Sequence, residues 1–254
     1  MRSLSLSVVI ITLNEEANLA RTLASACWAD EIVVVDSGST DRTREVAESF
    51  HAKFYVEPWK GFAAQKNSGL VKASGEWILS LDADEEVEAA LADEIRTVLA
   101  ANPSVAGFWI PRKNFFLGRW IKHGGFYPDP KLRLFRRGTG TFEDRLVHED
   151  IRLDGTTARL QHHLLHHAYP TLDSYIEHMN RYSSLGAEMA HGKRSRGFSF
   201  ISIVVRPKFT FLYNYLMRLG FLDGHEGLLL HAYHATYVSW KYAKAWEISR
   251  KPRA

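Results

Sequence analysis

Residues 76–86 read EWILSLDADEE, an apolar run that ends abruptly in acidic residues. The large apolar side chains between Trp77 and Leu81 are typical of a buried strand. Asp82 and Asp84 follow where that strand ends, and in an open α/β sheet ligands bind at this end of the strands. Two carboxylates one residue apart in an extended segment point the same way, so they repel unless a cation lies between them. The stretch therefore predicts a site for a hard divalent cation, Mg²⁺ or Mn²⁺, with room for phosphate oxygens.

A second interpretation of the same residues is purely structural. Asp82 and Asp84 could cap a helix that begins near Glu85, because carboxylates stabilise helix N-termini. Acidic residues are common at helix starts, so this stretch alone does not decide between the two interpretations. The rest of the chain has to decide.

Composition limits the class of protein. The 254 residues are 46% hydrophobic and 24% charged, which fits one large domain or one domain with an appendage. A net charge of +3 is weaker than a nucleic-acid-binding domain carries, so we expect no nucleic-acid partner. The single cysteine, Cys27, excludes an internal disulfide and a cysteine-based metal cluster, and we expect it to pack against the sheet.

Targeting signals are not evident in the sequence. Residues 1–13 carry one charge and run straight into a strand pattern, unlike a secretory signal. No apolar run reaches the roughly 18 residues that cross a bilayer. We expect a cytoplasmic protein.

The first hundred residues alternate between strand and helix patterns. We expect strands over residues 4–13, 31–35, 53–56 and 77–81, and helices over residues 43–50, 62–71 and 87–101. This alternation indicates an α/β fold with a mostly parallel sheet and right-handed crossovers. Neither a Gly-x-Gly-x-x-Gly motif nor a Walker-type loop is present. A nucleotide would then be held by the polar strand ends at Asn14, Asp36 and Asp82.

The second half of the chain has a different composition pattern. Aromatic and basic residues interleave over residues 108–123, and residues 131–136 read as a strand with one basic face. Such interleaving suits nucleic acid, but the weak net charge disfavours it, and aromatic platforms also suit a sugar ring. Residues 142–150 form a dense titratable cluster, and histidine pairs follow at residues 162–163 and 166–167. Either this cluster is functional or it is a solvated loop.

Residues 197–222 are largely apolar and are flanked by Arg and Lys. Too short to span a bilayer, this segment is similar to an interfacial segment on an anionic leaflet. The alternative is a helical hairpin that packs on the core or on a second subunit, which would make the protein a homo-oligomer. We expect a last helix over residues 227–248.

Four motifs resemble one enzyme family. The segments VVIITLNEE (8–16), VVVDSGSTD (33–41), AQKN (64–67) and LDAD (81–84) resemble the family 2 glycosyltransferases of GT-A fold. Four later segments resemble the lipopolysaccharide-core β-1,4-glucosyltransferases that act on inner-core heptose: KLRLF (131–135), VHE (147–149), HHAY (166–169) and GFLDG (220–224). The resemblance implies a GT-A domain over residues 1–190, with a nucleotide-sugar half (1–101) and an acceptor half (102–190). Residues 191–254 would form a helical, membrane-associating extension.

The resemblance also implies roles for particular residues. Asp36 would contact the uridine, Lys66 the base or the diphosphate, and Asp82 the ribose and a metal-bound water. The nucleotide-sugar site as a whole would comprise Thr12, Asn14, Glu15, Asp36, Ser37, Lys66, Asp82 and Ala83. The family often has two acids where this chain has Asp36 and Ser37, so a uracil contact from the second position is in question.

The remaining roles concern metal, base and acceptor. Asp84 and His166 would bind the divalent cation, with His167 as the alternative to His166. Glu149 would be the general base, with Asp144 as the alternative. Trp120 and Arg133 would bind the acceptor.

These roles define an expected reaction. We expect inverting transfer of a hexose, glucose first, from a UDP-sugar to a lipid-linked oligosaccharide at the inner face of the cytoplasmic membrane. The nearest rival is transfer onto a polyprenyl phosphate. A nucleotidyltransferase is disfavoured because the Gly- and Arg-rich first loop is missing. A non-catalytic sugar-nucleotide binder or membrane scaffold is disfavoured because clustered carboxylates cost stability without a role.

Overall fold

The computed structural model describes residues 5–143, 150–193 and 198–250, which form two compact units. Unit 1 comprises residues Met1–Arg112 and Asp129–His166, and unit 2 comprises Lys113–Pro128 and His167–Ala254. This division differs from the expected boundary after residue 190. The reason is a separate apolar cluster, in which Phe116 and Ile121 pack with Tyr175 and Leu230.

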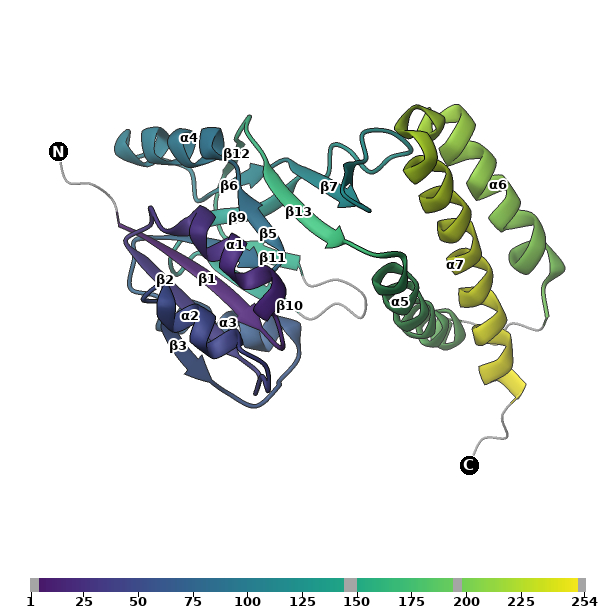
Figure 1. Ribbon diagram of the computed structural model, residues 1–254, viewed down its shortest axis with the longest axis horizontal. Helices are drawn as coiled ribbons and strands as arrows, with labels where there is room; N and C mark the ends of the chain where they lie inside the picture. The colour runs from purple at the N-terminus through teal and green to yellow at the C-terminus, as the bar shows by residue number, and fades with distance from the viewer. Residues whose placement is uncertain (1–4, 144–149, 194–197, 251–254) are drawn as a thin grey trace. The chain divides into compact units, whose positions relative to one another are not determined.

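Unit 1 is built on a seven-stranded sheet, within the described residues, in the order β12-β6-β9-β4-β1-β2-β3. β1 pairs in parallel with β2 and β4, β2 with β3, and β12 with β6, whereas β9 is antiparallel to both β4 and β6 (Figure 1). The strands are β1 (Leu6–Thr12), β2 (Glu31–Asp36), β3 (Lys53–Val56), β4 (Trp77–Asp82), β6 (Gly107–Ile110), β9 (Lys131–Arg136) and β12 (Thr157–Arg159).

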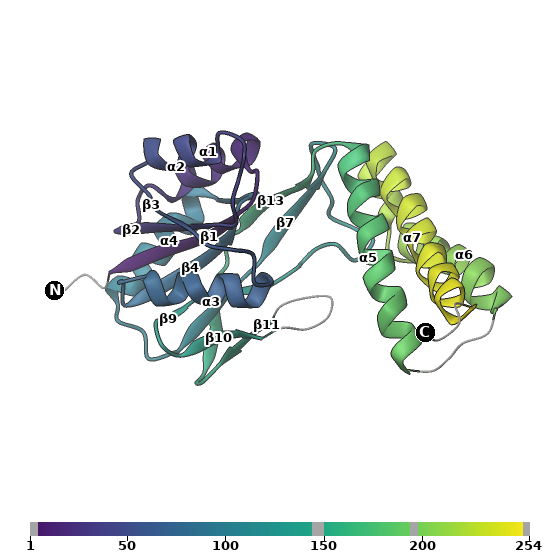
Figure 2. The same ribbon diagram turned by 90° about the horizontal axis from the view of Figure 1, so that it is seen from below.

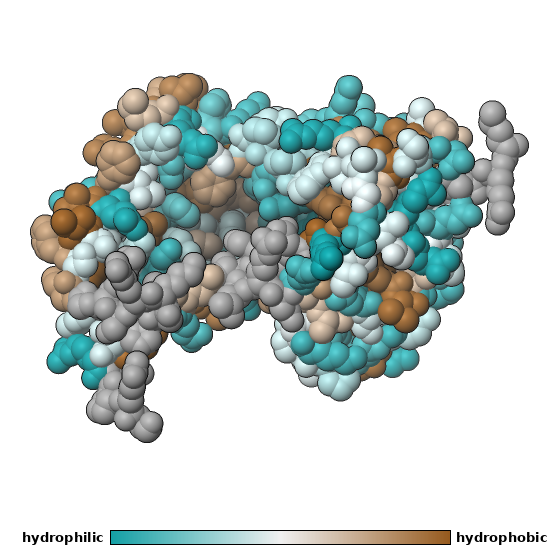
Figure 3. All heavy atoms as spheres, turned by 180° about the vertical axis from the view of Figure 1, so that it is seen from behind, coloured by the Kyte–Doolittle hydropathy of each residue, from teal (hydrophilic) through white to brown (hydrophobic). Residues whose placement is uncertain are grey.

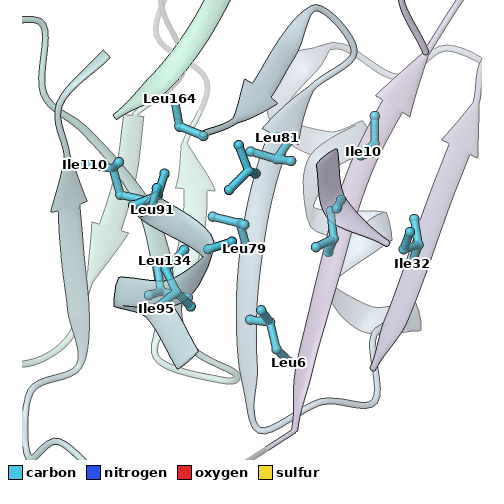
Figure 4. Packing of buried hydrophobic residues seen from close by; sticks show 14 of the residues in the cluster. Leu6, Ile10, Ile32, Leu79, Leu81, Leu91, Ile95, Ile110, Leu134 and Leu164 are labelled. Atoms are coloured by element: carbon cyan, nitrogen blue, oxygen red, sulfur yellow. The ribbon is translucent and has the colours of Figure 1, made fainter. Parts of the chain in front are cut away.

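Helices cover both faces of this sheet. α1 (Glu16–Ala26), α2 (Thr43–Ser49) and α4 (Ala89–Ala100) pack on one face, and α3 (Phe62–Lys72) packs on the other (Figure 2). Alternate residues of one strand serve the two faces, so Val8 and Ile10 belong to one apolar cluster and Val9 to the other. Figure 4 shows the larger cluster, in which Leu91 and Ile95 of α4 approach Leu79 and Leu134 of the sheet. Being buried on both faces explains why these strands read as continuous apolar runs.

Shorter strands complete unit 1. β5 (Glu85–Val87) pairs with β13 (Leu164–Tyr169), and β10 (Gly140–Glu143) pairs with β11 (Asp150–Leu153). β13 begins in unit 1 and continues into unit 2, as does β7 (Arg112–Phe116).

The predicted parallel α/β organisation is confirmed, with differences at two places. The helix expected from residue 87 begins at Ala89, because residues 85–87 form β5 instead. A helix therefore does not start at Glu85, and the capping interpretation of Asp82 and Asp84 is wrong. Cys27, expected against the sheet, is exposed because it lies just beyond the end of α1.

Unit 2 is mainly helical. α5 (Leu172–Lys193) packs along α7 (Gly224–Arg250), and Lys244 links them by donating to the backbone and side-chain oxygens of Asn180 at 2.8 and 2.6 Å. A helical segment packs on α7 as well and consists of η1 (Ile201–Val205), α6 (Arg206–Leu212), η2 (Tyr213–Met217) and η3 (Gly220–Asp223). β7 pairs with β8 (Arg119–Trp120). Within the described residues no helix is long and apolar enough to cross a membrane.

A buried histidine lies at the centre of unit 2. His231 is 1% exposed, and neither ring nitrogen has a hydrogen-bond partner in the described part of the chain. Its ring occupies the space that Cβ atoms at Gly124 and Gly220 would need, at 2.0 and 2.3 Å from those positions. Burial, and to a smaller extent nearby His234, lowers the pKa of His231 from 6.5 to about 4, and Asp223 opposes the shift.

This histidine makes stability depend on pH. As the pH falls below 6.5, His231 takes up a proton in the unfolded chain, whereas in the folded chain it does so only near pH 4. The folded state therefore loses stability as the pH falls from 6.5 to about 4. We expect the native protein to lose about 2 kcal/mol of unfolding free energy between pH 7 and pH 5 from this group. His231→Gln should remove that part of the loss in urea titrations at the two pH values. Equal losses in the two proteins would contradict the prediction.

Candidate active site

The carboxyl ends of β1, β2 and β4 lie side by side. Thr12 pairs with Asp36 across β1 and β2, and Ile11 pairs with Asp82 across β1 and β4. Three polar strand ends are thereby brought to one edge of the sheet, as the sequence predicted. This edge is the usual ligand-binding edge of such a sheet.

Asp36 organises the loop that follows β2. Its carboxylate accepts the hydroxyl hydrogen of Thr12 at 2.9 Å and the backbone N–H groups of Gly38 and Ser39 at 2.8 and 2.7 Å. Only 2% of Asp36 is exposed. Its position beside the site is clear, but a contact between its carboxylate and uridine stays a prediction.

Asn14 and Ser37 frame this loop. Asn14 adopts a left-handed backbone (φ 55°), and its side-chain oxygen accepts the backbone N–H of Thr40 at 2.9 Å. The hydroxyl of Ser37 is buried and has no hydrogen-bond partner in the described residues. Ala83 is buried too, and its carbonyl accepts the hydroxyl hydrogen of Thr22 at 2.6 Å.

Asp82 is held by two cations of the protein itself. Its Oδ1 lies 2.8 Å from Nζ of Lys66, and its Oδ2 pairs with the guanidinium of Arg133. Burial would raise the pKa of Asp82, but the positive charges of Arg133 and Lys66 hold it well below its ordinary value. Both oxygens of Asp82 are therefore paired internally, which leaves Asp84 as the carboxylate better placed for an added cation.

Glu85 extends this pairing into a network. Its side chain is fully buried and lies 2.9 Å from Arg133 and 2.9 Å from Arg112, and it accepts the backbone N–H of Asp82 at 3.0 Å. Arg112 also pairs with Asp129 at 2.7 Å. Burial would lower the pKa of Arg133, but the carboxylates of Asp82 and Glu85 raise it, so Arg133 stays charged. An acceptor contact from Arg133 stays a prediction.

Asp84 has a different environment. Its Oδ2 lies 3.3 Å from Nε2 of His166, which β13 places opposite Glu85 of β5. Burial would raise the pKa of Asp84, but His166 outweighs it and lowers the pKa, so Asp84 is ionised. Burial raises the pKa of Glu15, and the nearby negative charge of Asp84 raises it further.

The spacing of Asp84 and His166 suits a divalent cation. Two ligands at right angles around Mg²⁺ are about 3 Å apart, since each lies about 2.1 Å from the ion. The 3.3 Å between Asp84 and His166 is close to this spacing, and a carboxylate oxygen is a ligand that Mg²⁺ and Mn²⁺ prefer. No group of three or more His, Cys, Asp or Glu that could hold a metal occurs in the described residues. Asp84 and His166 can therefore supply two ligands to a divalent cation.

Trp120 and His167 belong to unit 2. Lys113 and Lys122 lie over the indole of Trp120, with Nζ 5.0 and 4.5 Å from the ring centroid, and Tyr127 meets it edge to face. His167 stacks on Phe115 at 5.1 Å, whereas His166 approaches Asp84, which favours His166 as the ligand. Asp144 and Glu149 lie outside the described residues, so their roles as general base stay predictions.

Sequence reasoning missed Glu85 as part of the site. It follows LDAD directly, but its role depends on β5, a strand of three residues whose partner β13 comes about eighty residues later. The alternation of basic residues in β9 was visible, and Arg133 there is the residue that Glu85 neutralises.

A mostly parallel sheet with helices on both faces and a charged carboxyl edge is the architecture of the GT-A enzymes. The chain belongs to glycosyl transferase family 2, whose model matches residues 7–163. It is 33% identical to the lipopolysaccharide core biosynthesis glycosyltransferase LpsC of Rhizobium meliloti (strain 1021), over 96% of this chain and 93% of LpsC. It is 29% identical to the uncharacterized glycosyltransferase RT0209 of Rickettsia typhi, over 98% of this chain and 89% of RT0209. The protein is therefore a glycosyltransferase.

Solved structures agree on the fold. The mannosyltransferase PcManGT of Pyrobaculum calidifontis, in complex with GDP-Man and Mn²⁺, aligns with a TM-score of 0.57 at 16% identity, over 96% of this chain and 88% of PcManGT. Residues 1–349 of TarS of S. aureus, in complex with UDP-GlcNAc, align with a TM-score of 0.50 at 17% identity, over 98% and 93%. The GT-A fold that the sequence resemblance implied is confirmed.

Proposed function

We propose that this enzyme transfers a hexose from a UDP-sugar to an inner-core lipopolysaccharide acceptor, with inversion at the anomeric carbon. Glucose is the sugar that we propose. The observation that carries the proposal is the pairing of Asp84 with His166 at 3.3 Å, beside an Asp82 that Lys66 and Arg133 already neutralise. The similarity to LpsC along nearly the whole chain supports a lipopolysaccharide-core acceptor. The complex of TarS with UDP-GlcNAc supports a UDP-sugar as donor.

We further propose that Asp84 and His166 hold a divalent cation. When bound, such a cation supplies Lewis-acid stabilisation for the leaving diphosphate. Next to this pair, the positive charges of Lys66 and Arg133 keep Asp82 ionised and hold its carboxylate in place. A rigid, prepaired Asp82 can then orient a ribose hydroxyl without movement during the reaction. The Mn²⁺ bound in the PcManGT complex is consistent with this assignment.

The acceptor side is proposed from unit 2. The indole of Trp120 has a lysine ammonium at 5.0 Å and another at 4.5 Å from its ring. An aromatic face suits the C–H face of a sugar, and ammonium groups suit a phosphate. The arrangement supports an acceptor that carries phosphate. We place the reaction at the inner face of the cytoplasmic membrane, where such a lipid-linked acceptor is anchored.

Proton removal needs a base. As the acceptor oxygen bonds to the anomeric carbon and the bond to the diphosphate breaks, the hydroxyl proton passes to a carboxylate, for which we propose Glu149. Glu149→Gln should lower kcat by about a hundredfold, because a positioned general base is worth at least this much. The rate of acceptor-dependent UDP release measures the effect, with Asp144→Asn as the matched variant. Near-wild-type turnover of Glu149→Gln would remove Glu149 from the role, and a loss in Asp144→Asn alone would assign the base to Asp144.

The same assay separates the alternatives. A polyprenyl-phosphate acceptor offers an oxygen that is already ionised, so both variants would stay active and UDP release would follow added polyprenyl phosphate. A non-catalytic binder would release no UDP with any acceptor. UDP release that depends on a deacylated core oligosaccharide is the result that the proposal predicts.

A further inference from the structure

The helical segment of unit 2 exposes an unusual set of side chains. Each exposed residue between 198 and 222 is either large and apolar or basic, with no exposed acidic or neutral hydrophilic residue among them. We call this set the apolar face: Phe198, Phe200, Ile201, Val205, Phe209, Leu212, Tyr213, Leu216, Met217, Leu219, Phe221 and Leu222, with Arg206, Lys208 and Arg218 among them. Figure 3 shows hydrophobic residues gathered over this part of unit 2, at the left of the view.

The exposure is not marginal. Met217 is 75% exposed, Ile201 68% and Phe209 67%. Exposed apolar residues recur every three or four positions from Ile201 to Leu216, so they form a stripe along one side of the helical segment. Soluble proteins seldom expose so continuous a stripe, and one of this kind marks an interaction surface.

The opposite side of the segment is anchored to α7. Ser239 of α7 donates its hydroxyl hydrogen to the carbonyl of Ile203 at 2.8 Å, and Tyr215 meets His231 of α7 edge to face at 6.2 Å. Pro207, in the first turn of α6, is buried. The segment therefore already has a packed side, and the apolar face is the side that this packing leaves outward.

Charge decides what can cover this face. Residues 198–222 contain three basic residues and no Asp or Glu. A second copy packed symmetrically on the face would bring these like charges together, which is unfavourable in an apolar contact. An anionic bilayer surface matches the pattern, because aromatic and aliphatic side chains enter the headgroup region while Lys and Arg reach lipid phosphates.

We propose that the apolar face is a docking surface for an anionic lipid bilayer, on which unit 2 lies without crossing it. This docking surface lies within unit 2 and is independent of the proposed sugar transfer. The surface would give the enzyme access to an acceptor embedded in the same bilayer. It also explains why apolar side chains face outward along a helical segment whose other side is packed.

Vesicle binding of the full chain tests the proposal without any activity assay. Vesicles of phosphatidylcholine and phosphatidylglycerol in equal parts should cosediment with the wild-type protein, and vesicles of phosphatidylcholine alone should bind it more weakly. Phe209→Glu and Met217→Glu should each weaken binding by at least about tenfold, since each removes a large apolar contact and adds a repelled charge. Lys208→Gln should weaken it by about fivefold.

The matched control is Val71→Glu, which changes an apolar residue that is 85% exposed on α3 of unit 1. It should bind the anionic vesicles as the wild type does. Circular dichroism should show all variants folded, because the altered side chains are exposed. The proposal would be overturned if the wild-type protein did not bind anionic vesicles, or if Phe209→Glu bound them as tightly as the wild type. A wild-type dimer in sedimentation equilibrium that Met217→Glu dissociates would overturn it in favour of a second copy.

Discussion

Asp84→Asn is expected to lower kcat about a thousandfold, because Lewis-acid stabilisation contributes several kcal/mol and each 1.36 kcal/mol is tenfold in rate. The amide keeps the shape of the side chain but removes the charge that His166 keeps ionised at 3.3 Å. Asp84 is not part of the Arg133–Glu85 network, so stability should change much less than activity. The measurement is acceptor-dependent UDP release with saturating Mg²⁺ or Mn²⁺.

Two controls make this result specific. Asp93→Asn removes a carboxylate that is 77% exposed on α4, and it should leave kcat unchanged. A chelator should silence the wild-type enzyme, and added Mn²⁺ should restore it. Turnover that survives the chelator, or an Asp84→Asn enzyme as fast as the wild type, would show that no cation acts at this site.

Arg133→Met is expected to lower the free energy of unfolding by about 3–5 kcal/mol, the usual cost of leaving a buried charge without its partner. Arg133 is 7% exposed and lies between the carboxylates of Asp82 and Glu85. Methionine fills similar space but leaves these two carboxylates facing each other with one cation fewer. Urea unfolding of the wild type and variant measures the difference.

The matched control is Arg44→Met. Arg44 pairs with Glu48 at 2.7 Å on the surface of α2, where its side chain is 64% exposed. Removing that pair should leave the free energy of unfolding close to that of the wild type, because solvent screens an exposed ion pair. A similar small effect for Arg133→Met would mean that the network contributes little to the fold.

Local pattern predicted the sheet well, and its central strands β1, β2 and β4 are buried on both faces. β3 and β9 begin and end where the sequence placed them, and β1, β2 and β4 agree within two residues. The same pattern predicted polar strand ends at Asn14, Asp36 and Asp82, and the register of β1 with its neighbours brings the ends of these strands to one edge. The loop after β4 was less predictable, because residues 83–84 form a turn rather than the extended segment that we assumed.

Long-range pairing accounts for what the sequence could not predict. The two carboxylates of the motif suggested a cation shared between them. In the structure Asp82 instead forms ion pairs with Lys66 of α3 and Arg133 of β9. Nothing within the LDAD motif indicates that its first acid has these partners while its second meets His166. The different environments of Asp82 and Asp84 therefore arise from tertiary contacts.

Mass spectrometry of a deacylated core oligosaccharide, incubated with the enzyme, a divalent cation and each of several UDP-sugars, tests the central claim most directly. We expect the acceptor to gain one hexose with UDP-glucose, and chelation or Asp84→Asn to prevent the gain. An acceptor whose mass stays unchanged with all the UDP-sugars, under conditions where the protein is folded, would contradict it.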